Sequence, residues 1–202
     1  MKLAIISGSQ RPGSQSARIG RVVQQALTAE FEGIETFFHD LGECPLPPCE
    51  EEYPLPPDRE PALWTRISGQ LKTSDGIVVV APEWGGMAPA SLKNFFLWCN
   101  DHELSHKPGL IVAVARRLGG AYPVAELRMS SYKNTQLCYI PEHIIVRNVE
   151  SMLTESEPPS ADAAALRDRL VYALRLLVEY ARALRAVRAS GAADLERYGW
   201  GM

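Results

Sequence analysis

The sequence predicts an α/β protein with a doubly wound parallel sheet of five strands and helices on both faces. Short apolar runs alternate with longer stretches of helical period along the 202 residues. One run, residues 77–81, is an unbroken series of four β-branched residues and an alanine, which is typical of a central strand covered on both faces. Strands that alternate with helices in this way form right-handed crossovers and a parallel sheet.

The predicted elements follow one another along one domain. Strands are expected at residues 3–6, 34–38, 77–81, 110–115 and 143–149. Helices are expected at residues 16–31, from 60 to a stop at 74–76, at 90–100, at 122–137, and from a cap at Ser160 or Asp162 to a break at Gly191. Residues 1–190 are predicted to form a single domain, with a C-terminal tail at 191–202.

Composition narrows the classes of partner and the location. The net charge of −3 argues against a nucleic-acid surface and gives no support for attraction to a membrane. No apolar run approaches the roughly 18 residues that cross a bilayer, and the N-terminus lacks the layout of a signal peptide, so a cytoplasmic location is expected. The four cysteines form no C-x-x-C pair and are predicted to be reduced thiols; the four histidines show no ligand spacing, so no metal is assigned.

The stretch after the first strand has the features of an anion site. A strand, a small-residue loop and a helix start follow in succession, and both the free N–H groups of the first helical turn and the helix dipole favour negative charge. Ser9, Ser14 and Ser16 offer hydroxyl donors, and Arg11 offers a planar fork of N–H groups suited to phosphate oxygens. An ordinary βα turn with a surface arginine remains the alternative, since the stretch is neither the dinucleotide fingerprint nor a P-loop.

Two more turn-rich loops follow predicted strands, at residues 82–89 and 116–120. Ligands of open α/β sheets bind outside the carboxyl ends of the strands, where the strand order reverses. Three loops at that edge suit a ligand with a phosphate and a flat ring. The proline-rich stretch 44–61 cannot be regular structure, and it is expected to be a flap near the site, a wrap over a neighbouring subunit or a passive connector.

Three motifs have the order and spacing of a known family. Residues 8–16 are similar to a G-S-x-R-x-x-S-x-[NS] phosphate loop. Residues 82–94, with Trp98 four residues on, are similar to P-E-Y-N-x-S-x-P-G-x-L-K-N, and Gly119-Gly120 match part of S-x-G-x-x-G-G. Over about residues 1–150 the chain therefore resembles the NADPH-dependent FMN reductase family, which has the flavodoxin-like fold.

The resemblance implies a fold, a cofactor and a reaction. It implies strand order 2-1-3-4-5 and a tightly held FMN that takes a hydride from NADPH or NADH. Electrons then pass to a small acceptor (a quinone, azo compound, metal oxyanion or free flavin) in ping-pong turnover, in a homodimer or homotetramer. Because hydride chemistry belongs to the flavin, no side chain is assigned as a catalytic acid or base.

The resemblance also places the cofactor-binding residues in the three loops. They are Ser9, Arg11, Ser14, Gln15 and Ser16 for the phosphate; Pro82, Glu83, Trp84, Gly85, Gly86 and Met87 for the ring; and Arg116, Gly119 and Gly120 in the third loop. Glu83 is expected to anchor its loop through main-chain N–H groups in preference to donating a proton. Arg116 and Arg117 are expected either to meet a phosphate of the nicotinamide cofactor or an acidic acceptor, or to end a solvated loop.

Three positions depart from the family pattern. Gly85 replaces an asparagine, Met87 replaces a serine, and Ala115 stands where the third loop often has serine. Each change removes a side-chain hydrogen bond, worth about 0.5–1.5 kcal/mol. They leave open a family member that has lost FMN and acts as a scaffold or regulator. A flavodoxin-type electron carrier is the other alternative, although the threonine-rich loop and strong acidity of such carriers are missing here.

Overall fold

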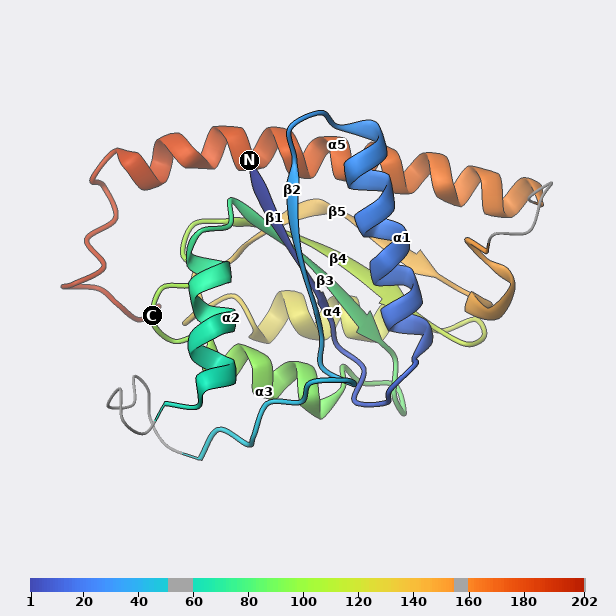
Figure 1. Ribbon diagram of the computed structural model, residues 1–202, viewed down its shortest axis with the longest axis horizontal. Helices are drawn as coiled ribbons and strands as arrows, with labels where there is room; N and C mark the ends of the chain where they lie inside the picture. The colour runs from blue at the N-terminus through green and yellow to red at the C-terminus, as the bar shows by residue number, and fades with distance from the viewer. Residues whose placement is uncertain (51–59, 155–159, 202) are drawn as a thin grey trace.

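The computed structural model describes residues 1–50, 60–154 and 160–201. Five parallel strands form one sheet in the order β2-β1-β3-β4-β5 between two layers of helices (Figure 1), which confirms the predicted doubly wound sheet and its strand order. The strands are β1 (Lys2–Ser7), β2 (Glu35–Asp40), β3 (Gly76–Pro82), β4 (Pro108–Val114) and β5 (Cys138–Val146). The helices are α1 (Gln15–Glu30), α2 (Ala62–Lys72), α3 (Ala90–Trp98), α4 (Ala121–Ser130), the short η1 (Val149–Ser151) and α5 (Ala161–Ala189).

The core lies on both faces of the sheet because successive strand residues point to opposite sides. Val78 of β3 packs in the layer of α1 and α5, together with Leu174 of α5. Its neighbour Val79 packs in the layer of α2, α3 and α4, together with Trp64 and Phe95. β3 and β4 are buried along their whole length, as predicted for central strands. Within the described ranges, no helix is long and apolar enough to cross a membrane.

The region between α4 and β5 differs from the prediction. The helix expected at 122–137 ends at Ser130, and the strand expected at 143–149 already begins at Cys138. The Ser131 N–H makes the last helical bond, to the Leu127 carbonyl at 3.1 Å, and the Ser131 hydroxyl donates to the same carbonyl at 2.7 Å. β5 is an edge strand, so it accommodates Pro141. Its first half mixes polar and apolar residues, and the hydrophobic pattern therefore did not predict a strand before residue 143.

The described start of the proline-rich stretch docks on α3 of its own chain. The Asn94 side chain accepts from the Cys49 N–H at 2.8 Å and donates to the Pro47 carbonyl at 2.9 Å. The Trp98 indole N–H donates to the same carbonyl at 2.9 Å, and Leu46 is buried. This part therefore covers α3, and the remainder of the expected flap, residues 51–59, lies outside the described residues.

Candidate functional site

The three predicted loops meet at the carboxyl edge of the sheet. They follow β1, β3 and β4, which are neighbours in the sheet. The winding direction reverses between β1 and β3, which is where doubly wound sheets bind their ligands. The Gly8 N–H donates to the Val80 carbonyl at 2.8 Å, and the Ser91 hydroxyl donates to the Gly8 carbonyl at 2.8 Å. These two bonds tie the first loop to β3 and α3.

The first loop ends in a capped helix. Ser14 is the N-cap of α1, and its Oγ accepts a first-turn amide at 3.1 Å. The amides of Gln15 and Ser16 have no acceptor within the helix, by the geometry of a helix start. Ser9 and Ser16 are 1% and 2% exposed, and the Ser9 Oγ accepts the Arg11 N–H at 3.2 Å. The loop thus combines buried hydroxyls with helix amides at its mouth.

A buried hydroxyl precedes this loop. Ser7, the last residue of β1, is fully buried, and among the described residues its Oγ has no hydrogen-bond partner. By strand alternation Ser7 shares a face with Leu3 and Ile5, which is the face covered by α1. An unpaired buried hydroxyl costs about 1–3 kcal/mol, so this position favours a polar ligand atom.

The turn after β2 braces the first loop. A Cβ on Gly42 would lie 2.4 Å from the Arg11 carbonyl oxygen, so glycine is required where the two backbones meet. Glu43 accepts the Gly13 N–H at 3.1 Å. The sequence did not predict these contacts of Gly42 and Glu43 with the first loop, because the residues around Gly42 indicate only a turn.

The second loop is a tight turn from Trp84 to Met87. The Trp84 N–H donates to the Met87 carbonyl at 2.9 Å, and the Met87 N–H donates back at 3.0 Å. Gly85 and Gly86 have φ of +55° and +79°, the left-handed pair that a two-residue hairpin turn requires. Glycine and asparagine are the residues that adopt this conformation most readily. Gly85 in place of asparagine therefore preserves the backbone of the loop.

Arg11 joins the first loop to the second. Its guanidinium carbon lies 4.9 Å from the ring centroid of Trp84, a cation–π contact. The structure thus brings together the arginine predicted for the phosphate and the tryptophan predicted for the ring. Met87 is 54% exposed at the same loop.

A carboxylate from α4 fixes the end of the second loop. Glu126 accepts the Ala88 N–H at 2.7 Å and pairs with Lys93. Burial pushes the pKa of Glu126 upward, but the bonds from Lys93 and Ala88 outweigh it and hold that pKa below its ordinary value. The charged carboxylate is the form that accepts both bonds, so it is the form that holds the loop.

Glu83 joins the second loop to the third. Its carboxylate accepts the Gly120 N–H, which confirms main-chain anchoring, although the amide belongs to the third loop. A Cβ on Gly119 would lie 2.5 Å from a Glu83 carboxylate oxygen, and Gly120 has φ of +103° with Ile145 packed against it. Gly120 is therefore required by its backbone conformation and by Ile145, whereas a side chain at position 119 would displace the Glu83 carboxylate.

The outer side of the third loop is charged and solvated. Arg147 donates to the Leu118 and Gly119 carbonyls at 2.8 and 3.1 Å. The Arg116 guanidinium lies 3.1 Å from Glu150, with both side chains mostly exposed. Arg116 and Arg117 line an open cavity of about 360 Å³ beside the loop.

Arg18 of α1 is a further residue that the sequence did not single out. Its guanidinium donates to the carbonyls of Val149, Met152 and Leu153 at 2.6, 3.0 and 2.7 Å. These bonds tie the helix behind the first loop to the segment after β5. The partners lie more than a hundred residues apart in the chain, so no local pattern could have found them.

Comparison with known protein families identifies the chain. The family model described as NADPH-dependent FMN reductase matches residues 1–151. The chain belongs to this family. The match confirms the predicted family, the FMN cofactor and NAD(P)H as the reductant, and it makes the chain an oxidoreductase.

Individual relatives are distant. The chain is 27% identical over 146 residues to the NADPH azoreductase of Bacillus sp. (strain OY1-2), across 72% of this chain and 76% of that protein. It is 26% identical over 114 residues to the quinone reductase of Escherichia coli (strain K12), across 55% of this chain and 58% of that protein.

Solved structures share the fold. An oxidoreductase from Corynebacterium diphtheriae superposes with a TM-score of 0.69 at 20% identity, over 89% of this chain and 95% of that chain. The flavoenzyme NAD(P)H:(acceptor) oxidoreductase FerB from Paracoccus denitrificans superposes with a TM-score of 0.66 at 19% identity, over 89% of this chain and 98% of that chain. The fold is therefore flavodoxin-like, as the motifs implied.

Proposed function

We propose that this protein transfers electrons from NADPH or NADH, by way of FMN at the three loops, to a small organic acceptor of the quinone or azo class. The observation that supports the proposal is the meeting of all three family motifs at one edge of the sheet, joined by the Arg11–Trp84 and Glu83–Gly120 contacts. The class of acceptor follows the relatives, which are named as an azoreductase and a quinone reductase.

The donors of the first loop fit the phosphate of FMN. The amides of Gln15 and Ser16 face out of the start of α1, where the helix dipole favours an anion. The hydroxyls of Ser9 and Ser14 lie beside them, and the unpaired Ser7 hydroxyl is buried directly before the loop. The exposed Arg11 guanidinium would supply charge-assisted bonds at the mouth.

The second and third loops fit the flat ring of FMN. Gly85 and Gly86 present main chain with open space where a side chain would lie, and Gly119 and Gly120 let the third loop come close to the second. The Trp84 ring borders the same space and is already held by Arg11. We assign the backbone from Pro82 to Met87 to the ring edge.

FMN, when bound, supplies the chemistry of accepting a hydride and returning two electrons. In the net reaction with a quinone, NAD(P)H loses a hydride, and the quinone gains two electrons and two protons to become a hydroquinone. The chain's own residues bind and orient the reactants. Glu83 is engaged with the Gly120 N–H, so it holds the third loop and moves no proton. The reductant and the acceptor would share one opening, which is the basis for ping-pong order.

The deciding experiment is an FMN titration followed by flavin fluorescence and the absorbance spectrum. Arg11→Ala should weaken FMN binding about tenfold or more, because charge-assisted hydrogen bonds contribute about 1.5–3 kcal/mol. Arg21→Ala is the matched control, since the exposed Arg21 guanidinium also lies 4.9 Å from a ring centroid, that of Phe38, but outside the three loops. Equal FMN affinity of the Arg11 and Arg21 variants would contradict the phosphate assignment.

Turnover separates the alternatives. Steady-state oxidation of NADPH with a quinone and with an azo dye should give parallel double-reciprocal lines. Tight FMN binding without NAD(P)H oxidation would instead identify an electron carrier. Absence of any FMN binding would identify a scaffold or regulator.

A homodimer or homotetramer and a cytoplasmic location are part of the proposal. Leu97 is 59% exposed and lines a groove of about 430 Å³ between α3 and α4, together with Phe96 and Leu127. Met129 of α4 and Tyr132 after it are 75% and 49% exposed. Exposed apolar patches of this kind favour association between protein chains, and sedimentation velocity would test it. Cys44, an exposed thiol that forms no disulfide, is consistent with a reducing compartment.

A further inference from the structure

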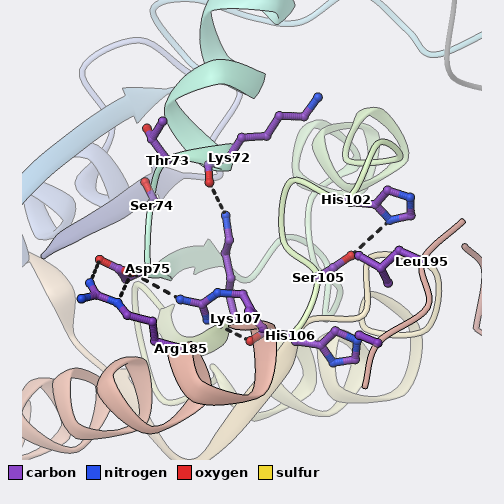
Figure 2. Close-up of a pocket in the computed structure, with 12 residues that line it drawn as sticks. Lys72, Thr73, Ser74, Asp75, His102, Ser105, His106, Lys107, Arg185 and Leu195 are labelled. Atoms are coloured by element: carbon purple, nitrogen blue, oxygen red, sulfur yellow. Dashed lines mark hydrogen bonds and ion pairs between the residues drawn. The ribbon is translucent and has the colours of Figure 1, made fainter. Parts of the chain in front are cut away.

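A second cavity lies at the opposite, amino edge of the sheet. It has a volume of about 410 Å³. Asp75 lies directly before β3 and Lys107 directly before β4, so the cavity is at the far end of these strands from the three loops. Figure 2 shows Asp75 and Arg185 on one side of it, Lys107 in the middle, and His102 and His106 beside Leu195 on the other side.

Positive charge is concentrated in this cavity. Four basic side chains line it, Lys72, Lys107, Arg185 and Arg188, against one carboxylate in the lining, Asp75. Lys72 also pairs with Asp101, which lies outside the lining. Asp75 is shared between two guanidiniums, with Arg185 at 2.8 Å and Arg188 at 3.3 Å. The whole chain has a net charge of −3, so the local excess of cations is opposite in sign to the average. Such an excess attracts anions into a concave site.

Of these four basic side chains, Lys107 is the one without an ion pair among the described residues, although the charges of Asp75 and Glu103 act on it from a distance. It is 5% exposed, and its ammonium donates to the Leu71 and Lys72 carbonyls at 2.7 and 2.9 Å. Among the described residues, no carboxylate accepts a hydrogen bond from it. Burial, and then the nearby Arg188, lower the pKa of Lys107 to about 8. An anion beside this group would stabilise its charged form.

Neutral donors and the C-terminal tail complete the cavity wall. His102 and His106 have φ of +60° and +53°, and the turn between them places both imidazoles beside the cavity (Figure 2). The Ser105 hydroxyl lies 3.4 Å from His102 Nδ1. Leu195 of the tail lines the same wall. A bound ligand would therefore contact the tail as well as α2 and α5.

We propose that this cavity binds a small oxyanion with two negative charges, of the phosphate type. Arginine and lysine side chains are the preferred partners of phosphate oxygens, and the volume lies in the range of small-molecule sites. The cavity and the three loops lie at opposite edges of the sheet, so the anion and FMN can be bound at the same time.

The test is calorimetric titration with inorganic phosphate at constant ionic strength, on protein loaded with FMN and then freed of unbound FMN, because free FMN carries a phosphate that would compete for the cavity. The expected result is one phosphate per chain. Lys72→Gln combined with His106→Asn should weaken it about tenfold, because a charged donor and a neutral donor are lost. Asparagine keeps the left-handed backbone at position 106, and the His106 side chain takes part in no hydrogen bond among the described residues.

Two controls make the result specific. Arg182→Gln removes a cation of α5 that pairs with Glu179 outside the cavity, and it should leave phosphate affinity unchanged. Arg11→Ala should also leave it unchanged, whether or not that variant loses FMN. No phosphate binding, equal affinity in the double variant, or loss of phosphate binding in the Arg11 variant would each overturn the proposal.

Hydrogen exchange gives an independent readout. Saturating phosphate should slow amide exchange in tail residues 192–198, because Leu195 lines the cavity. The same phosphate should leave exchange of these residues unchanged in the double variant. Unchanged exchange in the wild-type tail would contradict the assignment of the ligand to this cavity.

Discussion

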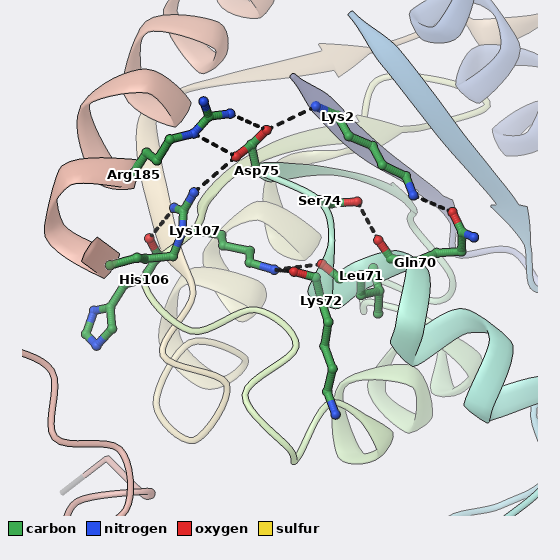
Figure 3. Close-up of polar contacts among 10 residues, drawn as sticks. Lys2, Gln70, Leu71, Lys72, Ser74, Asp75, His106, Lys107 and Arg185 are labelled. Atoms are coloured by element: carbon green, nitrogen blue, oxygen red, sulfur yellow. Dashed lines mark hydrogen bonds and ion pairs between the residues drawn. The ribbon is translucent and has the colours of Figure 1, made fainter. Parts of the chain in front are cut away.

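The two edges of the sheet are built from different interactions. At the carboxyl edge, turn glycines and a capped helix shape the loops, and the Glu83 and Glu126 carboxylates each hold one backbone N–H. At the amino edge, charged side chains from distant elements meet around Asp75 (Figure 3). The first edge presents main-chain donors to a ligand, whereas the second presents cationic side chains, two of which share Asp75.

Asp75 shows what the amino edge contributes to stability. Its carboxylate accepts the Lys2 N–H at 3.1 Å and also bonds Arg185 and Arg188 (Figure 3). One side chain therefore links β1, the start of β3 and the C-terminal half of α5. The contribution of Asp75 to stability is thus separated in space from FMN binding at the carboxyl edge, and the following variants test that separation.

The largest expected effect is on folding, from Asp75→Asn. Loss of this charge leaves Arg185 and Arg188 without an ion pair among the described residues. Arg188 is largely buried and Arg185 is exposed, so the free energy of unfolding should fall by about 2–3 kcal/mol, below the full cost of breaking a buried pair. FMN affinity should stay within about twofold, because the substitution is far from the flavin loops. Urea denaturation and FMN titration on one preparation measure both quantities. Asp168→Asn is the control, an exposed α5 acid without an ion pair among the described residues.

The same carboxylate predicts a dependence on acid. Burial raises the pKa of Asp75, but the bonds from the Lys2 N–H and Arg185 outweigh it and leave that pKa below its ordinary value of 3.8. Its stabilising contribution is therefore complete above the unfolded pKa and is lost as the pH falls through the lowered folded pKa. The stability difference between wild type and Asp75→Asn should shrink below about pH 4. If the stability difference between wild type and Asp75→Asn stays constant down to about pH 2, the charge of Asp75 does not contribute to stability.

In wild type, the free energy of unfolding should rise at alkaline pH, and Lys107→Met should abolish this rise. The pKa of Lys107 is lowered from 10.5 to about 8 in the folded protein. Above about pH 8 the unfolded chain therefore binds more protons than the folded chain, and the free energy of unfolding rises with pH. Wild type should gain about 2 kcal/mol over the variant between about pH 8 and about pH 10, measured by urea unfolding. The raised pKa values of the buried Cys99 thiol and the half-buried Cys138 thiol act in the opposite direction. Lys107 lowers the pKa of Cys99, so the comparison is made in a Cys99→Ala background. Lys133→Met, at an exposed lysine, should track wild type.

The sequence predicted the carboxyl edge better than the amino edge, for a physical reason. A left-handed turn at Gly85-Gly86 or a helix cap at Ser14 depends on residues a few positions apart, so the local pattern contains it. The Asp75–Arg185 pair joins residues 110 positions apart, and such contacts depend on the folded chain. The same holds for the approach of Gly42 to Arg11, while the early start of β5 was hidden because an edge strand tolerates polar residues and proline.

At the carboxyl edge, Glu83→Gln should weaken FMN binding with little effect on folding. Glutamine keeps an acceptor for the Gly120 N–H but loses the charge that strengthens the bond. FMN affinity should fall about fivefold, and the free energy of unfolding should change by less than about 1 kcal/mol. Glu126→Gln is the comparison at the Ala88 N–H, and it should act in the same direction. A loss of stability with unchanged FMN affinity would place Glu83 with Asp75 as a folding residue.

The smallest expected effect is that of Arg116→Gln, which distinguishes the two interpretations of the third loop. The Arg116–Glu150 pair is mostly exposed, so its loss should change the free energy of unfolding by less than about 0.5 kcal/mol. If Arg116 meets the phosphate that distinguishes NADPH from NADH, KM for NADPH should rise about threefold while KM for NADH stays constant. Arg169→Gln breaks an exposed pair with Glu142 on the edge of the molecule and should change neither KM. Equal KM values in wild type and Arg116→Gln would assign Arg116 to a solvated loop end, because a guanidinium that bound the phosphate could not be removed without weakening NADPH.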